Sequence, residues 1–186
     1  MRDFIYVYMK EPKVTVLGPG TRYVLWVQGC YQNCEGCVAA NAKDMEKGTP
    51  IKISALVYEI LFSNSEGITI SGGEPFMQAE ELSDLLGKIK KKKDLGVIVY
   101  TGYLYEELLK NSAAKKLLSH IDLLIDGPYI KSLDDGKSLR GSSNQRILFL
   151  TDRYKDYEKE YGIEGRYTEN FYHGIHIHEI GIPSNK

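Results

Sequence analysis

The sequence predicts a single α/β domain built on parallel strands, and two observations support this fold class. First, a chain of 186 residues, 42% of them hydrophobic, can bury a substantial core without disulfides. Second, short β-branched or apolar runs alternate with amphipathic stretches, the pattern of βαβ units around a parallel sheet. The pattern fits an open doubly wound sheet or an incomplete barrel, and both folds place a ligand at the carboxyl ends of the strands.

The expected elements follow from hydrophobic periodicity. Continuous apolar or β-branched runs predict strands over residues 22–28, 67–71, 95–101, 121–127 and 145–150. Apolar residues at helical spacing predict helices over 53–62, 78–93, 104–110 and 112–120, the first capped by Ser54. Beyond about Asp152 the chain is polar, which indicates a surface helix or loop. Residues 171–182 alternate like a last strand at the sheet edge.

Charge and hydropathy exclude two classes of partner. The net charge is −1 and both signs are spread along the chain, so no global field favours nucleic acid or an anionic membrane. No apolar run approaches the roughly 18 residues that span a bilayer, and the N-terminus lacks the features of a signal peptide. We therefore expect a cytoplasmic protein with neither a nucleic-acid nor a membrane partner.

The three cysteines of the chain, Cys30, Cys34 and Cys37, are spaced C-x3-C-x2-C. A structural zinc site uses four protein ligands, whereas a cubane iron–sulfur cluster held by three thiolates leaves one iron open to a substrate or cofactor. Zinc bound by Cys34 and Cys37 with His176 and His178 is one alternative. Unliganded thiols or a redox pair are the others.

A second motif follows the next predicted strand. In "ITISGGEPFMQ", Gly72 and Gly73 allow another group to approach the backbone closely, and Pro75 stiffens the turn. Together with the carboxylate of Glu74, the glycine pair suits recognition of an ammonium group by charge-assisted hydrogen bonds. Such a turn also occurs as a plain strand-to-helix connector. The motif therefore indicates a binding site only because it occurs together with the cysteine loop.

The two motifs together resemble those of the radical S-adenosylmethionine (radical SAM) enzymes. The resemblance implies an incomplete TIM-type barrel of parallel strands with outer helices. It also implies a [4Fe-4S] cluster ligated by Cys30, Cys34 and Cys37, with the methionyl group of S-adenosylmethionine chelating the open iron. Gly72, Gly73 and Glu74 would then contact this cofactor.

Further segments narrow the resemblance to the activating enzymes of glycyl radical enzymes. "GPGTRYVLWVQGC" is similar to their approach to the cluster loop, and "CEGC" to the branch that activates anaerobic ribonucleotide reductase. "VYTGYLYEEL", "LLIDGPYI" and "LRGSSNQRI" are similar to that branch in order and spacing. The resemblance covers about residues 18–150. We therefore expect one domain over residues 1–186, with a core at about 14–150 and a C-terminal extension over 151–186 that carries the last strand.

In this fold the strand ends with Tyr100, Thr101, Gly102 and Asp126 would line the cofactor pocket. Thr101 is expected to bind the cofactor, and Asp126 is expected near the cofactor or a bound cation, although a plain turn also explains Asp126. The segment 140–146 offers groups for the cofactor carboxylate, a helix cap or a partner.

Two features lie outside the pattern. Of His173, His176 and His178, one is a candidate for contact with adenine, and a polar strand face is the alternative. The run from Lys88 to Lys93 suits an acidic partner or reductant, or else the C-terminal dipole of its helix.

The resemblance implies a function and its partners. The enzyme would cleave S-adenosylmethionine reductively to a 5′-deoxyadenosyl radical and install a glycyl radical on anaerobic ribonucleotide reductase. A flavodoxin or ferredoxin would supply the electron. A radical SAM enzyme acting on a peptide or small molecule is one alternative, and a non-enzymatic zinc or iron–sulfur module is another.

Overall fold

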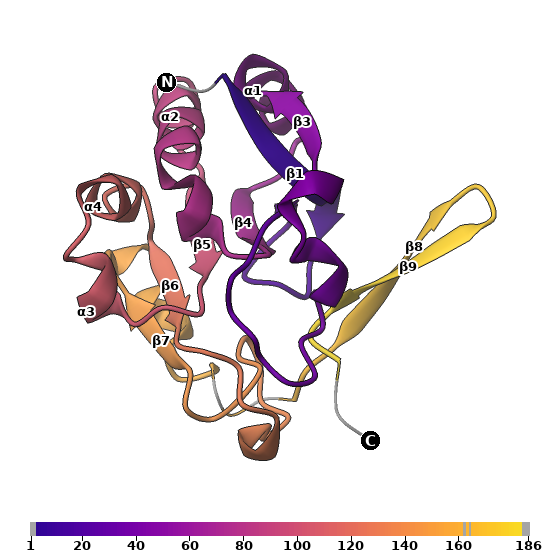
Figure 1. The fold of residues 1–186 in the computed structure, drawn as a ribbon, viewed down its shortest axis with the longest axis vertical. Coiled ribbons are helices and arrows are strands. Elements are labelled where there is room, and N and C mark those ends of the chain that lie inside the picture. Colours follow the sequence, from indigo (N-terminus) through magenta and orange to yellow (C-terminus); the bar gives the residue numbers. More distant parts are fainter. Residues whose placement is uncertain (1–2, 162, 164, 184–186) are drawn as a thin grey trace.

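Seven strands form the central sheet, in the order β3-β1-β2-β4-β5-β6-β7 (Figure 1). The computed structural model describes residues 3–161, 163 and 165–183. The strands of this sheet are β1 (Phe4–Val14), β2 (Arg22–Val27), β3 (Thr49–Lys52), β4 (Gly67–Gly72), β5 (Gly96–Tyr100), β6 (Leu123–Asp126) and β7 (Arg146–Phe149). The α-helices are α1 (Ile53–Phe62), α2 (Ala79–Lys90), α3 (Tyr105–Leu108) and α4 (Ser112–Leu118). A second sheet pairs β8 (Thr168–His173) with β9 (His176–Gly181).

The centre of the large sheet is parallel. β2 pairs with β4, β4 with β5 and β5 with β6 in parallel register, whereas β1, β3 and β7 are antiparallel to their neighbours. The four parallel strands therefore end at the same edge, where the loops that follow them meet. This edge is the expected place for a ligand.

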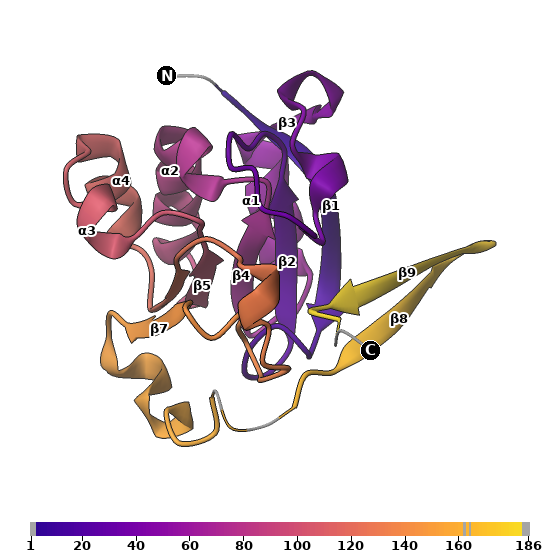
Figure 2. The same ribbon diagram turned by 60° about the horizontal axis from the view of Figure 1, so that its bottom comes forward.

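One face of the sheet carries the helices. Alternate residues of the parallel strands, such as Leu25, Ile70 and Val99, pack in one cluster with apolar side chains of all four α-helices. Figures 1 and 2 show α1, α2 and α4 side by side along this face. A doubly wound sheet has helices on both faces, so that alternative is wrong for the part of the chain that the structure describes.

The opposite face, here called the helix-free face, is covered by loops and by the C-terminal part of the chain. Ile98, Leu123 and Ile125 pack there against Tyr154, which lies in a 3-10 helix over Asp152–Tyr157. Val24 packs with Leu17 and with Ile180 of β9. Residues from both ends of the chain thus complete this second core.

A buried arginine lies within the helix-free face. Arg22, only 1% exposed, stands at the start of β2. Its guanidinium donates five hydrogen bonds, to Thr69 Oγ1 (2.6 Å), Ile68 O (2.6 Å), Gly96 O (3.0 Å), Pro19 O (3.1 Å) and the hydroxyl oxygen of Tyr154 (2.9 Å). Its centre also lies 5.5 Å from the ring centroid of Tyr154, a cation–π distance. Each of the five acceptors is an uncharged oxygen, so the hydrogen bonds of the cation are all made to neutral groups.

The structure also corrects two sequence expectations and adds two strands. Ser54 does not cap α1, because Lys52 occupies the N-cap position and the helix begins at Ile53. Residues 171–182 do not form one edge strand of the main sheet; they turn at Gly174 and belong to the β8–β9 hairpin, which projects from the body (Figures 1 and 2). β1 and β3 were not expected at all.

The other expected strands and helices are confirmed, with small shifts of their ends. None of the helices in the described ranges has the length and apolar composition needed to cross a bilayer.

Candidate functional site

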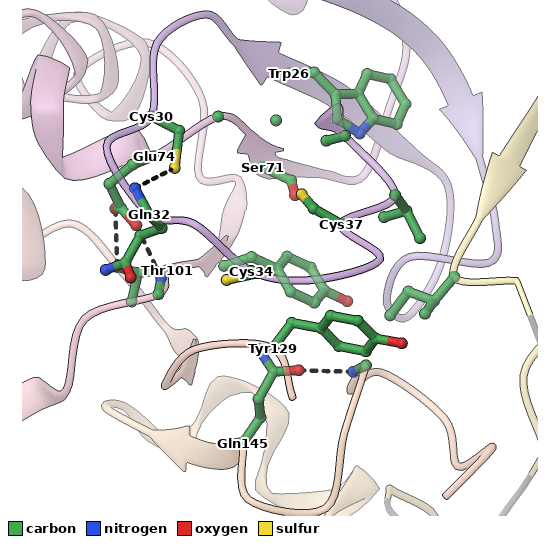
Figure 3. A pocket seen from close by; sticks show the side chains of 18 of the residues that line it. Trp26, Cys30, Gln32, Cys34, Cys37, Ser71, Glu74, Thr101, Tyr129 and Gln145 are labelled. Carbon is green, nitrogen blue, oxygen red and sulfur yellow. Dashed lines mark hydrogen bonds between the residues drawn. The ribbon is translucent and has the colours of Figure 1, made fainter. Parts of the chain in front are cut away.

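The cysteine loop leaves the carboxyl end of β2 and is fixed by its backbone. Gly29 adopts φ +99°, a left-handed conformation that favours glycine, and its N–H donates to Ala42 O at 2.7 Å. The N–H of Cys30 donates to Lys43 O at 3.0 Å. Cys30, Cys34 and Cys37 are partly exposed free thiols, and all three line one pocket at the strand ends (Figure 3).

The glycine pair packs directly against this loop. Gly73 N–H donates to Val27 O at 2.8 Å, and Glu74 N–H donates to Gly29 O at 2.7 Å. A Cβ on Gly73 would lie 2.2 Å from Gly29 O, so no other residue fits without moving the backbone. Gly72 and Gly73 also line the pocket. The glycines are therefore needed to join the two loops, besides leaving main chain open to a ligand.

The Glu74 carboxylate ties the second loop to the end of β5. Oε1 accepts hydrogen bonds from Thr101 Oγ1 at 2.8 Å and from Phe76 N–H at 3.0 Å, and Oε2 accepts from Gly102 N–H at 2.8 Å. Glu74 is 1% exposed, and this burial raises the pKa of its carboxyl group to about 7. Glu74 and Thr101 line the pocket, and the observed contacts of the carboxylate hold the pocket wall together.

Asp126 lies at the end of β6, behind the pocket lining. Its carboxylate accepts hydrogen bonds from Arg146 Nε at 2.9 Å and from Tyr105 N–H at 2.7 Å, and Arg146 also pairs with Glu106. The neighbouring Gly127 lines the pocket, whereas Asp126 is not among its lining residues. A contact of Asp126 with the cofactor stays a prediction.

Polar side chains of the segment 140–146 organise the loop between β6 and β7. Gln145 Oε1 accepts from Gly141 N–H at 2.8 Å, and Gln145 Nε2 donates to Gly127 O at 2.9 Å. Arg140 pairs with Asp135. Gln145 and Gly141 line the pocket, so this segment forms part of its wall.

Several lining residues were not expected from the sequence: Trp26, Gln32, Ser71 and Tyr129, whereas Gln145 belongs to the segment 140–146 that was expected to offer polar groups (Figure 3). Trp26 and Ser71 are the next-to-last residues of β2 and β4 and alternate with core residues along these strands. Strand periodicity could therefore have placed them on the helix-free face. Gln32 lies between two cysteines. Tyr129 and Gln145 come from an irregular loop, for which periodicity gives no signal.

The tail histidines lie away from the cysteines. His173 Nε2 contacts Glu11 Oε2 at 2.6 Å, and His176 and His178 lie on β9 of the projecting hairpin, outside the pocket lining. Within the described residues no group of three or more His, Cys, Asp or Glu side chains converges as for a single metal ion. The zinc site with Cys34, Cys37, His176 and His178 is therefore not assembled.

The lysines of the run 88–93 are partly engaged by the protein itself. Lys88 pairs with Asp84 at 2.6 Å, Lys90 with Asp122 at 3.6 Å, and Lys93 Nζ donates to Ser65 O at 3.1 Å. Lys91 and Lys92 are exposed. These contacts engage part of the run within the fold, and both its interaction with the C-terminal dipole of α2 and docking of an acidic partner stay predictions.

The donor set fits a cluster better than one ion. Each thiolate of a cubane binds a different iron, so the three sulfurs need not converge on a single point. Gly72 and Gly73 also line the cavity that the thiols share. Because glycines have no side chain, this part of the wall leaves room for a further ligand. Burial raises the pKa of the Cys30 thiol, partly opposed by a hydrogen bond from Gln32 N–H at 3.3 Å. Metal coordination offsets such a cost because it requires and stabilises the thiolate.

Comparison with known proteins agrees with this geometry. The family described as "4Fe-4S single cluster domain" matches residues 16–148. An anaerobic ribonucleoside-triphosphate reductase-activating protein of Enterobacteria phage T4 is 35% identical over 143 residues, which cover 74% of this chain and 89% of the phage protein. Proteins of the same name from Salmonella typhi and Escherichia coli K12 are 33% and 32% identical, each over 75% of this chain and 95% of the relative. The chain belongs to the family of anaerobic ribonucleoside-triphosphate reductase-activating proteins, with a 4Fe-4S single cluster domain.

Proposed function

We propose that this protein is the activating enzyme of an anaerobic ribonucleotide reductase and works as a radical SAM enzyme. One observation carries the proposal: all three cysteines of the chain line the pocket that Gly72 and Gly73 also line, and no histidine is among the described residues that line it. A cofactor that binds the open iron of a cluster explains why there are only three cysteines and why the glycine backbone lies beside them. The names of the relatives supply the reductase as the protein substrate.

The residues have distinct roles in this proposal. Cys30, Cys34 and Cys37 hold a [4Fe-4S] cluster, and the backbone of Gly72 and Gly73 receives the methionyl group of S-adenosylmethionine. When bound, the cluster and S-adenosylmethionine supply a 5′-deoxyadenosyl radical that abstracts hydrogen from a glycine Cα of the reductase. The protein positions these groups and restricts water.

Glu74 and Thr101 position the site in two ways. The Glu74 carboxylate fixes the end of β5 through Thr101 and Gly102, which keeps the β5 side of the pocket at a constant distance from the cysteine loop. Thr101 also faces the pocket and is available to the cofactor. Asp126 supports the pocket from behind its lining, because its hydrogen bonds with Arg146 and Tyr105 N–H fix the start of the β6–β7 loop.

The sheet is proposed to be an incomplete TIM-type barrel within one domain. Its parallel centre, its helices on one face and a pocket on the other at the carboxyl strand ends support this description. A gap in such a barrel suits entry of a polypeptide. The reductant in this proposal is a flavodoxin or ferredoxin, and the reaction is cytoplasmic.

The test is anaerobic. The protein is reconstituted with iron and sulfide, reduced and mixed with S-adenosylmethionine, and 5′-deoxyadenosine is measured by chromatography beside the paramagnetic spectrum of the cluster. Product together with a spectral change on adding the cofactor supports the proposal. A zinc-loaded protein with neither cluster nor product would refute it.

A second experiment separates the reductase from other substrates. The protein is co-expressed with the anaerobic reductase of the same organism, and a glycyl radical is sought by electron paramagnetic resonance. The expected result is a radical that needs both proteins. Cofactor cleavage without any radical on the reductase would favour a peptide or small-molecule substrate.

A further inference from the structure

The C-terminal extension crosses the helix-free face from one side to the other. It is described here over residues 151–161, 163 and 165–183, and it lies beyond the family match, which ends at residue 148. Tyr154 anchors its start against β5 and β6, and Ile180 anchors its end against β2 and the residues after β1. Figure 2 shows it running below the sheet from β7 to the edge at β1.

The hairpin end of the extension is fixed by polar contacts as well. Glu169 accepts hydrogen bonds from Thr15, including the Thr15 N–H at 2.9 Å, and His173 contacts the buried carboxylate of Glu11. These contacts hold the extension against β1 and the residues that follow it. The extension is therefore a docked part of the fold.

The extension reaches the pocket at two places, at Arg166 between its anchors and at the residues directly after Ile180. Arg166, Gly181, Ile182 and Pro183 line it, and they complete the wall between the β6–β7 loop and the side formed by Leu17 and Trp26. A pocket assembled from the family-matched residues alone would lack this side.

Arg166 joins the extension to the β6–β7 loop. Its side chain is 2% exposed and forms an ion pair with Asp134, whose side chain is 6% exposed. Nη1 donates to Pro183 O at 2.9 Å and to Asp134 Oδ2 at 3.4 Å, Nη2 donates to Gly141 O at 3.2 Å and to Asp134 Oδ1, and Nε donates to Lys137 O at 3.2 Å. These five bonds match the five N–H donors of a guanidinium group.

We propose that Arg166 is a positioning residue that locks the C-terminal extension against the β6–β7 loop and so completes the wall of the cofactor pocket. This inference rests on the proposed function for the identity of the ligand. Arg166 acts through Asp134, Gly141 and Pro183, which it holds in one arrangement.

The chemistry of the contact requires arginine. A lysine has three donors on one atom and cannot reach a carboxylate and three separate carbonyl groups at once. Burial of Asp134 opposes its ionisation, but hydrogen bonds from Arg166 and from Gly136 N–H lower the pKa of Asp134 below its ordinary value. The pair is thus charged at neutral pH, and loss of Arg166 removes the cation that faces the buried Asp134 carboxylate, which would keep neutral donors such as Gly136 N–H and the Tyr129 hydroxyl.

The test compares Arg166→Lys with Arg153→Lys. Arg153 is the matched control, because it lies in the same extension outside the pocket lining, and it pairs with Asp94 at the surface and with Asp122 at 3.7 Å. Two quantities are measured well below the melting temperature: amide hydrogen exchange of the whole protein, and the affinity of the reconstituted protein for S-adenosylmethionine.

In Arg166→Lys we expect exchange to rise at least about tenfold in both residues 134–141 and residues 166–182, since the free energy of local opening falls. The affinity for S-adenosylmethionine should fall about tenfold, as expected when one wall of a site is no longer held in place. Arg153→Lys should change neither quantity. If Arg166→Lys does not fold, Asp134→Asn, which removes the partner charge, replaces it in the same test.

Three outcomes would overturn the proposal: unchanged exchange in residues 134–141, unchanged affinity despite faster exchange, or equal effects of the Arg153 variant. If the unmodified protein binds no S-adenosylmethionine, the proposed function fails, and the exchange data still decide whether Arg166 locks the extension.

Discussion

Replacing Arg22 by lysine tests how the helix-free face is held together. Lysine keeps the positive charge but offers three donors in place of five. At least two of the five acceptors around Arg22 would then lose their donor. Tyr154 would also lose its cation–π partner, so the start of the C-terminal extension would be less firmly bound.

The expected cost follows from these contacts. A buried polar group without a partner costs about 1–3 kcal/mol, so two such groups cost about 4 kcal/mol. For a chain of this size each kcal/mol lowers the melting temperature by about 2–4 °C, which gives a decrease of roughly 8–16 °C. The same substitution at the surface residue Arg153 should change the unfolding free energy by less than about 0.5 kcal/mol.

Both variants are compared by urea unfolding, followed by circular dichroism, and by thermal melting. Arg22→Lys should lower the urea midpoint while the slope of the free energy against urea stays constant. A loss of less than about 1 kcal/mol in Arg22→Lys would show that water or shifted side chains replace the missing donors. In that case the reasoning from donor counts would be refuted.

Three other predictions address the site. Cys34→Ala should abolish formation of 5′-deoxyadenosine but leave the melting temperature of the metal-free protein nearly unchanged, because Cys34 lies outside the core; turnover at the normal rate would contradict the ligand assignment. Native Glu74 keeps its proton up to about pH 7 and unfolded Glu74 only to about 4.5, so the free energy of unfolding should fall as pH rises through this window, by on the order of 3 kcal/mol from this group. Urea titrations at several pH values should show this slope, and an equal slope in Glu74→Gln would exclude Glu74 as its cause. Gly73→Ala would place a Cβ 2.2 Å from Gly29 O, so it should prevent cluster assembly, which is measured by visible absorbance. The control Gly87→Ala makes only ordinary contacts in α2 and should be neutral or stabilise the fold by about 0.5–1 kcal/mol. Normal cluster content in Gly73→Ala would count against the close packing of the two loops.

The parallel centre of the sheet could be predicted because buried strands there are continuous apolar runs. β1 could not, since bulges between Val7 and Met9 and between Glu11 and Val14 break its alternation. β3 is a short edge strand that contains Pro50, a residue that argues against a strand unless it lies at an edge. The hairpin did leave a signal: Gly174, with φ +63°, marks the two-residue turn between β8 and β9.

The positions of the candidate site residues could be predicted where these residues belong to short sequence motifs. The cysteines and the glycine pair follow two strands that turn out to be neighbours, so sequence order was enough to bring them together. The roles of Glu74 and Asp126 could not be predicted in the same way, because both carboxylates bind partners twenty or more residues away in the sequence. Arg166 gave no signal at all, since its partners come from an irregular loop.

The backbone bonds that fix the cysteine loop also bear on repair. Ala42, Lys43 and Glu74 hold the start of the loop through main-chain atoms, and no thiol belongs to a core cluster. In the proposed function, loss of the cluster would therefore leave the sheet and helices in place, and the loop would stay attached at its base. We therefore expect a metal-free chain whose thiols are still reduced to take up iron and sulfide again without first being refolded.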